Sequence, residues 1–211
     1  MAEASKNPQL ELWRGEFGHA YAARNKADDA VVRSLTRMWS RMLDGARPSP
    51  RSMLEVGANI GLNLRALRRI TDADLFAVEP NDKARGVLIA DGVLDTDHAK
   101  DGAADALPFE TGSVDLAFTS GVLIHVHPDR LAQCCKEIYR VSKRHILCSE
   151  YYAKQPREIT YRGLVDYLFL RDFGAFWLET CPDLRLLDYG FFWTGDGAAD
   201  DLTWWLFEKP Q

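Results

Sequence analysis

The chain has 211 residues, of which 46% are hydrophobic and 27% charged, as in an ordinary globular protein of one domain. Its formal net charge of −5 argues against nucleic acid as a partner, because binding to phosphates needs a basic face. No apolar run reaches the roughly 18 residues of a membrane helix, and residues 1–12 are polar, so we expect no membrane span, no secretory signal and a cytoplasmic location.

Hydrophobic patterning predicts alternating helices and strands up to residue 150. Apolar positions at helical spacing indicate a helix over residues 27–44, which Asp28 or Asp29 caps. The run Val114–Ser120 is apolar on both faces, as in a buried parallel strand. The predicted strands are 52–56, 74–78, a short one near 94–98, 114–120 and 145–150, and the helices between them are 62–70, one from the cap Asn81 to about 90, and 128–141.

The rest of the chain ends in a predicted hairpin. Residues 151–166 are irregular, aromatic and charged, and a helix is predicted over 171–180. Strands over 185–193 and 202–208 have no helix between them, so we expect them to pair antiparallel. The whole pattern predicts an α/β fold, a Rossmann-like, doubly wound and mostly parallel sheet with helices on both faces.

The most informative motif is the turn after the first predicted strand. Gly57 and Gly61 allow the backbone to turn sharply and to approach a ligand closely. Glu79 ends the second strand, where a carboxylate can accept hydrogen bonds from a ribose diol. The pattern is G-x-x-x-G preceded by Glu55, not the dinucleotide pattern G-x-G-x-x-G, and Glu55 disfavours a pyrophosphate. A glycine turn between two acids fits S-adenosylmethionine (SAM), which is cationic and has a ribose but no phosphates; the alternative is an ordinary turn with Glu79 on the surface.

Other polar residues follow the carboxyl ends of the predicted strands, where ligands bind in such sheets. Asp105-Ala106 is a candidate adenine site, or else the start of a turn before Pro108. His125 follows the strand that ends at Ser120, and is a candidate acid–base residue or a structural histidine.

Aromatic residues accompany these polar groups. Glu150-Tyr151-Tyr152 supplies a carboxylate and two phenols that can shield a sulfonium, unless they form only an aromatic cluster at the sheet end. Tyr161 and Arg162 lie in the irregular segment, where arginines can hold an anionic acceptor or can simply be solvated. The aromatic segment from Trp13 to Asn25 is either a lid over the cofactor or a helix packed on the sheet edge.

These motifs resemble the class I SAM-dependent methyltransferases, whose fold is a seven-stranded sheet with an antiparallel last strand. More narrowly, residues 13–209 resemble the methylases associated with pseudaminic acid biosynthesis. The motifs that carry this resemblance are Trp13-x-Gly15-Glu16-Phe17-Gly18-x-x-Tyr21-x-x-Arg24-Asn25, Gly57-Ala58-Asn59-Ile60-Gly61-Leu62-Asn63, Glu150-Tyr151-Tyr152-x-x-x-Pro156-x-Glu158-Ile159-x-Tyr161-Arg162-Gly163, Arg171-Asp172-Phe173, Asp188-Tyr189-Gly190 and Asp200-Asp201-Leu202-Thr203-Trp204.

The resemblance implies a role for each candidate residue. It implies an N-terminal helical lid over residues 1–45 and a SAM-binding catalytic domain over 46–211, within one domain overall. The cofactor would be bound by Glu55, Gly57, Asn59, Gly61, Glu79, Asp105, Ala106 and Ser120. The catalytic group would comprise His125, Glu150 and Tyr152, and the lid and acceptor side Trp13, Phe17, Tyr21, Arg24, Asn25, Tyr151, Tyr161 and Arg162.

We therefore predict transfer of the SAM methyl group to a small polar metabolite, such as a nucleotide-activated nonulosonic sugar or an amine or hydroxyl of a secondary metabolite. One alternative is a cyclase that converts SAM itself to a small cyclic amino acid of the azetidine-2-carboxylate type and releases methylthioadenosine. Another is a non-catalytic SAM-binding subunit. We expect a monomer or homodimer. We also expect no metal site, because the four cysteines include no C-x-x-C pair and suit reduced, buried thiols.

Overall fold

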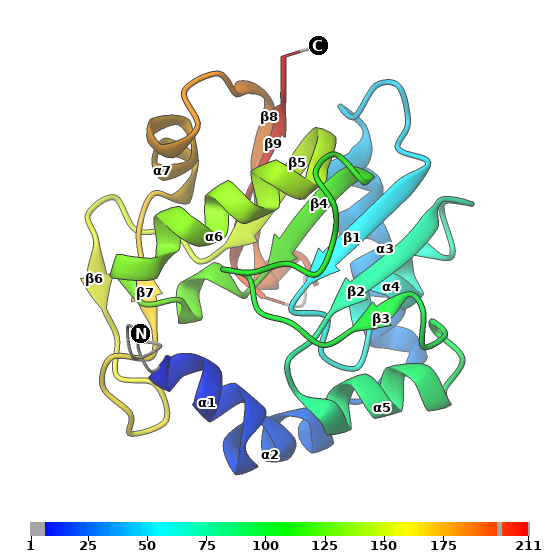
Figure 1. The fold of residues 1–211 in the computed structure, drawn as a ribbon, viewed down its shortest axis with the longest axis vertical. Coiled ribbons are helices and arrows are strands. Elements are labelled where there is room, and N and C mark those ends of the chain that lie inside the picture. The colour runs from blue at the N-terminus through cyan, green and yellow to red at the C-terminus, as the bar shows by residue number, and fades with distance from the viewer. Residues whose placement is uncertain (1–6, 198–199, 211) are drawn as a thin grey trace.

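The computed structural model describes residues 7–197 and 200–210, which form one seven-stranded sheet flanked by helices (Figure 1). The strand order is β3-β2-β1-β4-β5-β9-β8. These strands are β1 Ser52–Val56, β2 Asp74–Val78, β3 Ala99–Lys100, β4 Val114–Ser120, β5 Ser142–Glu150, β8 Arg185–Phe192 and β9 Leu202–Glu208, and a separate pair comprises β6 Arg157–Glu158 and β7 Phe169–Leu170. The helices are α1 Pro8–Arg14, α2 Glu16–Arg24, α3 Asp29–Leu43, α4 Leu62–Leu67, α5 Asp82–Ala90, α6 Pro128–Val141 and α7 Phe173–Thr180, with short 3₁₀ turns η1 Leu123–His125 and η2 Thr194–Asp196.

The pairing of the strands confirms the predicted fold class. Strands β1 to β5 pair parallel, and β9 pairs antiparallel with both β5 and β8. A parallel connection needs a crossover, which the helices supply, whereas the β8–β9 hairpin turns back directly. In the described part of the chain, no helix has both the length and the apolar content needed to cross a bilayer.

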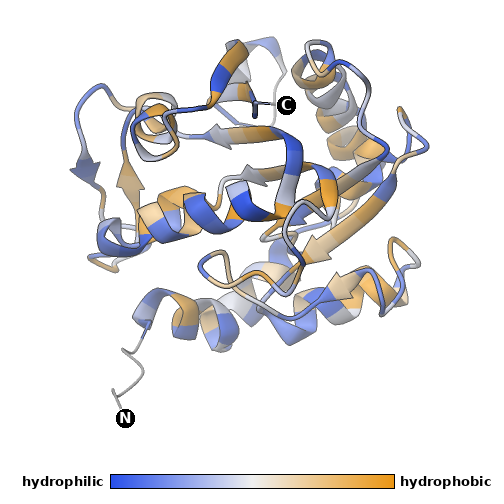
Figure 2. Cartoon of the chain, turned by 45° about the horizontal axis from the view of Figure 1, so that its top comes forward, coloured by the Kyte–Doolittle hydropathy of each residue, from blue (hydrophilic) through white to orange (hydrophobic). Residues whose placement is uncertain are grey.

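The core has two layers because the sheet is covered on both faces. On one face Trp39 and Met42 of α3 pack with Leu64 of α4 over the sheet, and on the other face α6 and α7 contribute Ile138 and Trp177. Figure 2 shows apolar residues along the strands and both apolar and polar residues along α6, as expected for a helix with one buried side. The four cysteines are free and buried, as predicted.

Several predicted boundaries are confirmed and others are shifted. Strand β5 begins at Ser142 instead of residue 145, β8 ends at Phe192 instead of 193, α4 ends at Leu67 instead of 70, and α3 spans Asp29–Leu43 instead of 27–44. Strands β1, β2, β4 and β9 and helix α6 have the predicted limits. The third strand is displaced to Ala99–Lys100, because the side chain of Asp95 accepts hydrogen bonds from the N–H groups of Asp97 and His98 and holds this stretch in a turn. The helix predicted over 171–180 begins at Phe173, where the side chain of Asp172 caps it.

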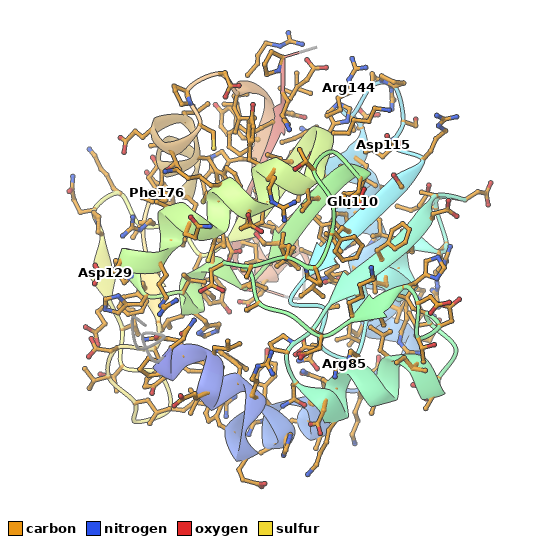
Figure 3. All side chains as sticks on the ribbon, in the orientation of Figure 1. Arg85, Glu110, Asp115, Asp129, Arg144 and Phe176 are labelled. Atoms are coloured by element: carbon orange, nitrogen blue, oxygen red, sulfur yellow. The ribbon has the colours of Figure 1, made fainter. Side chains whose placement is uncertain are left out.

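The N-terminal segment forms two short helices rather than one. Helix α1 ends at Gly15, and α2 packs so closely against it that a Cβ on Gly18 would lie 1.8 Å from the carbonyl oxygen of Trp13. The amide of Asn81, at the start of α5, donates a hydrogen bond of 2.8 Å to that same carbonyl. The pair α1–α2 therefore lies across the carboxyl ends of the strands (Figure 1). Asp115 and Arg144 lie near the opposite end of the sheet (Figure 3).

Candidate active site

A cavity of about 320 Å³ lies between the strand ends and the helices α1 and α2. Cavities that bind small molecules usually have volumes of about 300–1,000 Å³. Ten of the sequence-predicted residues line it, namely Trp13, Tyr21, Asn25, Glu55, Gly57, Asn59, Glu79, Asp105, Ser120 and His125. The wall does not include Phe17, Arg24, Gly61, Ala106, Glu150, Tyr151, Tyr152, Tyr161 or Arg162.

The glycine loop forms the floor of the cavity. Gly57 has φ +81° and donates a backbone hydrogen bond of 2.7 Å to Val78, which ties the loop to β2. A Cβ on Gly57 would lie 2.6 Å from the side chain of Val122, so the tight turn requires glycine here. Gly61 has a different position from the one expected: it begins α4 and packs toward Leu88, outside the cavity wall.

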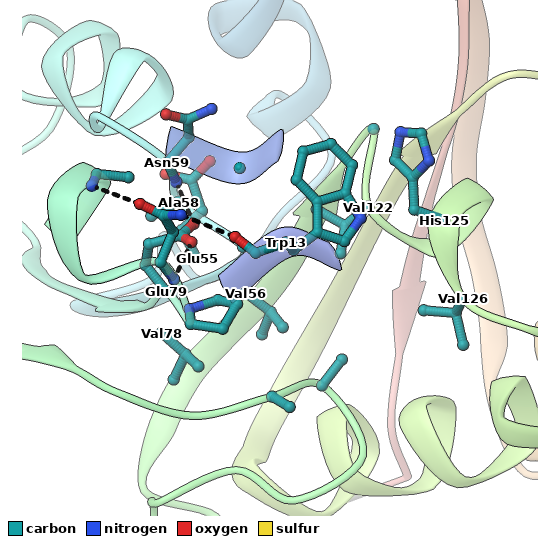
Figure 4. Close-up of a pocket in the computed structure, with 18 of the residues that line it drawn as sticks. Trp13, Glu55, Val56, Ala58, Asn59, Val78, Glu79, Val122, His125 and Val126 are labelled. Carbon is teal, nitrogen blue, oxygen red and sulfur yellow. Dashed lines mark hydrogen bonds between the residues drawn. The ribbon is translucent and has the colours of Figure 1, made fainter. Parts of the chain in front are cut away.

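Glu79 braces this loop from the end of β2. Its carboxylate accepts hydrogen bonds from the backbone N–H groups of Asn59 at 2.6 Å and Asn81 at 2.7 Å. Burial raises the pKa of Glu79, and these hydrogen bonds oppose that effect. Figure 4 shows Glu79 beside Asn59 at one side of the cavity. The acid is thus held rigidly at the position where a ribose is expected in this type of sheet.

Glu55 is buried in the cavity wall with an incomplete set of partners. It is 2% exposed, and its Oε1 accepts a hydrogen bond of 2.7 Å from the amide of Asn63. Its Oε2 has no partner among the described residues, and the same holds for Oδ1 of Asn59. Burial, together with the nearby carboxylate of Glu79, raises the pKa of Glu55 to about 8.

These unpartnered oxygens test whether the residues fit SAM. A buried acceptor without a partner is costly, so such atoms in a cavity wall indicate a ligand that donates hydrogen bonds. SAM offers an ammonium group and two ribose hydroxyls as donors. Glu55 and Asn59 both belong to the wall of this cavity, and each has a buried acceptor without a partner. The carboxylate of Glu79 lies in the same wall. The wall therefore fits SAM in the hydrogen-bonding character of its groups.

The proposed adenine segment lies partly on the wall. Asp105 lines the cavity, and its Oδ2 forms an ion pair of 2.9 Å with Arg130. Ala106 is turned away, because its N–H bonds back to the carbonyl of Ala103 in a tight turn. The residues that line the cavity instead are Gly102, Ala103 and Ala104, which sequence reasoning missed because their small side chains carry no chemical signal.

His125 lies on the opposite wall, in the turn after β4. Its Nδ1 lies 2.7 Å from the carbonyl oxygen of Tyr167, and because a carbonyl only accepts, Nδ1 carries the proton and Nε2 remains basic. Burial lowers the pKa of His125 to about 4, so the ring is neutral near pH 7. The ring centre lies 4.9 Å from those of Trp13 and Tyr161 (Figure 4 shows Trp13 and His125).

Two of the predicted catalytic residues lie elsewhere. Glu150 is fully buried, and its carboxylate accepts hydrogen bonds from the N–H groups of Val122, Leu123 and Ile124 at 3.0 to 3.4 Å. It therefore caps the turn that carries His125, and burial raises its pKa to about 7. Tyr152 is 45% exposed and lies near Trp205 on the outer side of the sheet. These positions correct the expectation that both side chains face the acceptor.

The remaining lid residues form a second layer around the cavity. Phe17 contacts Trp13 and Tyr161 edge-on, and the hydroxyl of Tyr151 donates to Asp200. The guanidinium of Arg24 lies 5.5 Å from the centre of the Tyr21 ring, and that of Arg162 lies 5.6 Å from the centre of the Tyr161 ring. Asn63, which the sequence analysis left without a role, is a polar residue on α4 that holds Glu55.

Part of the chain matches a known protein family. Residues 54–147, which include the glycine loop, Glu79 and His125, match the family model described as a methyltransferase domain. No curated protein matches the chain significantly. The chain shares its fold with solved structures of low sequence identity.

The 1,6-didemethyltoxoflavin-N1-methyltransferase of Burkholderia thailandensis, solved with 1,6-didemethyltoxoflavin and S-adenosylhomocysteine, has a TM-score of 0.72 at 15% identity, over 100% of this chain and 93% of that one. The magnesium protoporphyrin IX methyltransferase of Synechocystis, solved with SAM, has a TM-score of 0.67 at 8% identity, over 99% and 100% of the two chains. A possible histamine N-methyltransferase of Thermotoga maritima has a TM-score of 0.64 at 15% identity, over 96% and 100%. At these identities the likeness establishes the fold.

Proposed function

We propose that this SAM-dependent methyltransferase transfers the methyl group to an amine or hydroxyl of a small polar acceptor, with His125 as the proton acceptor. The match of residues 54–147 and the fold support the enzyme class and the cofactor. The acceptor is the new part of the proposal. The resemblance of the N-terminal and 150–163 motifs suggests a nucleotide-activated nonulosonic sugar as the first acceptor class to test.

The observation that supports the proposal most directly is the fixed tautomer of His125. The carbonyl of Tyr167 holds the proton on Nδ1, so Nε2 is the basic nitrogen of a ring that lines the cavity. Its pKa of about 4 keeps this nitrogen unprotonated throughout the neutral range. A positioned general base contributes roughly 100- to 10,000-fold to a proton transfer, and a weak base with this pKa belongs at the low end of that range.

The other cavity residues would bind the cofactor. SAM supplies an electrophilic methyl group on a sulfonium. We propose that Glu79 accepts from the ribose hydroxyls, Glu55 from the ammonium group and Asp105 from the adenine amine, while Ser120 borders the sulfonium. Trp13 and Tyr21 of the lid exclude water from the reacting groups, and their ring faces favour a cation beside them.

Mass spectrometry of the purified protein with SAM, without and with nucleotide-activated nonulosonic sugars, tests the proposed function. We expect S-adenosylhomocysteine only with an acceptor, together with a product heavier by one methylene. Substitution of His125 by Gln should lower kcat roughly 100-fold or more and leave the Kd for SAM unchanged. Tight SAM binding without any product from any acceptor class would favour a non-catalytic subunit instead.

One observation favours a second candidate, the cyclisation of SAM. The cavity volume of about 320 Å³ is at the small end for a ligand site, and α1–α2 already cover it. A site that encloses only the cofactor suits a reaction in which the amine of SAM attacks the chain carbon next to sulfur, the carbon–sulfur bond breaks and methylthioadenosine leaves. Methylthioadenosine formed from SAM alone, with no acceptor present, would establish this reaction and overturn methyl transfer.

A further inference from the structure

Two arginines lie beside the aromatic side of the cavity without carboxylate partners. Arg24 at the end of α2 and Arg162 in the loop after β6 are exposed, and each guanidinium lies against a tyrosine ring, Tyr21 and Tyr161 respectively. Tyr21 lines the cavity, and burial raises the pKa of its hydroxyl. The positive charges of both guanidiniums oppose this effect and lower the pKa of Tyr21. Within residues 7–197 and 200–210, neither arginine forms an ion pair.

Two acids, Asp200 and Glu158, have hydrogen-bond partners other than these arginines. Asp200 accepts a hydrogen bond from the hydroxyl of Tyr151, which itself lies close enough to interact electrostatically with Tyr21 and Tyr161. Glu158 accepts a hydrogen bond from the backbone of Asp166. A chain with a formal net charge of −5 thus places two arginines without an ion pair around Tyr21, a residue of the cavity wall.

The backbone of Arg162 gives a second, independent indication of a ligand. Tyr161 and Leu164 exchange both of their backbone hydrogen bonds, and Arg162 and Gly163 between them have φ +52° and +83°. This is a type I′ turn, in which the first central position strongly favours Asn, Asp or Gly. Arginine is disfavoured there because its Cβ crowds the backbone at positive φ. Local structure alone does not explain an arginine at this position, whereas a ligand would.

We propose that Arg24 and Arg162 form a clamp for an anionic group, a carboxylate or a phosphate. The proposal rests on the proposed function, because it assumes that SAM occupies the cavity. Guanidinium groups bind both kinds of anion with paired hydrogen bonds. The anion has two possible sources, the carboxylate of SAM itself or an acidic group on the acceptor.

The test uses Arg162→Asn, Arg24→Gln and the control Arg157→Asn. Asparagine suits the type I′ turn, so Arg162→Asn should fold at least as stably as the wild type while it removes the charge. Arg157 is an exposed arginine of the same segment on β6 without an ion pair among the described residues, so its substitution removes an equal charge away from the clamp. Thermal unfolding of all three variants establishes that they are folded.

Two titrations distinguish the sources of the anion. If the clamp holds the carboxylate of SAM, the Kd for SAM should rise roughly tenfold or more in both clamp variants, and the Kd for methylthioadenosine, which lacks a carboxylate, should not change. If it holds the acceptor, the SAM affinity should stay constant, while inorganic phosphate should bind the wild type saturated with S-adenosylhomocysteine and not the clamp variants. The control Arg157→Asn should match the wild type in both titrations.

The clamp is overturned if both clamp variants bind SAM and phosphate as the wild type does, or if Arg157→Asn shows the same losses. Failure of the proposed function has a different signature, since the wild type would then not bind SAM at all. In that case the clamp can still be tested without cofactor, by a comparison of the Kd for inorganic phosphate between the wild type and Arg162→Asn.

Discussion

His125, which lies in the cavity wall, and the buried Glu150 behind it differ in what their polar atoms contact. Glu150 directs its carboxylate to three backbone N–H groups of the turn that carries His125, and its pKa of about 7 keeps it largely neutral below that pH. We therefore predict that Glu150→Gln, which mimics the protonated acid, retains folding and activity at pH 6. Glu150→Ala leaves these N–H groups unsatisfied and should cost about 2–4 kcal/mol in the free energy of unfolding.

Urea unfolding and steady-state kinetics of both variants check this prediction. The comparison with His125→Gln is the control, because that substitution should lower kcat without an equal loss of stability. A loss of 100-fold or more in kcat for folded Glu150→Gln would contradict the capping role and indicate that Glu150 takes part in the reaction itself.

For individual residues, the sequence predicted which polar groups lie at the sheet edge but not the direction of each side chain. Glu79 and His125 line the cavity as expected, because each follows directly from the end of a parallel strand. Glu150 and Tyr152 also lie at a strand end, yet one turns into the backbone of η1 and the other outward. The path of η1, which decides this, depends on contacts between strands β4 and β5 that no local pattern encodes.

Among the elements, the start of α5 connects the sheet to the lid. The side chain of Asn81 caps α5 through the N–H of Ala84 at 3.0 Å and also donates to the carbonyl of Trp13 in α1. We predict that Asn81→Ala loses about 1 kcal/mol of stability with the cap and also loosens α1–α2. Asn81→Asp keeps a good cap but cannot donate, so it should loosen α1–α2 with a smaller loss of stability.

Hydrogen exchange of residues 8–24, with urea unfolding alongside, measures these two effects separately. Both variants should show faster exchange in α1 and α2, and in both the Kd for SAM should rise, because Trp13 and Tyr21 belong to the cavity wall. Unchanged exchange in Asn81→Asp would show that the bond to Trp13 does not hold the lid.

The elements that were predicted accurately are those with their own local signals. Asn81, Asp28 and Pro128 mark helix starts through caps or a fixed φ, and apolar runs mark β1, β2 and β4. The break between α1 and α2 lies at Gly15, which caps both helices, and the close contact of Gly18 with the Trp13 carbonyl depends on how the two helices pack. β3, of only two residues, owes its register to β2 rather than to its own sequence.

For the whole molecule, the buried ionisable groups predict how stability depends on pH. Burial lowers the pKa of His125 to about 4 from 6.5, so its contribution to stability is lost as the pH falls below 6.5 toward 4. Burial has the opposite consequence for Glu55 and Glu150, whose pKa values rise from 4.5 to about 8 and about 7. Each stays protonated in the folded state while the unfolded chain ionises, so stability falls as the pH rises through this window.

Between pH 6.5 and 8 the effect of His125 is small, because most of its protonation in the unfolded chain occurs below pH 6.5, whereas Glu55 and Glu150 both contribute to the decline. Their shifts within this window correspond to a loss of about 2 kcal/mol in the free energy of unfolding, of which Glu55 accounts for about two thirds. Urea unfolding of the wild type at the two pH values should show this decline, and Glu55→Gln, which cannot ionise, should show only about a third of it. An equal decline in both proteins would mean that Glu55 is already ionised in the folded state, and that its unpartnered Oε2 meets the cofactor as a carboxylate from the outset.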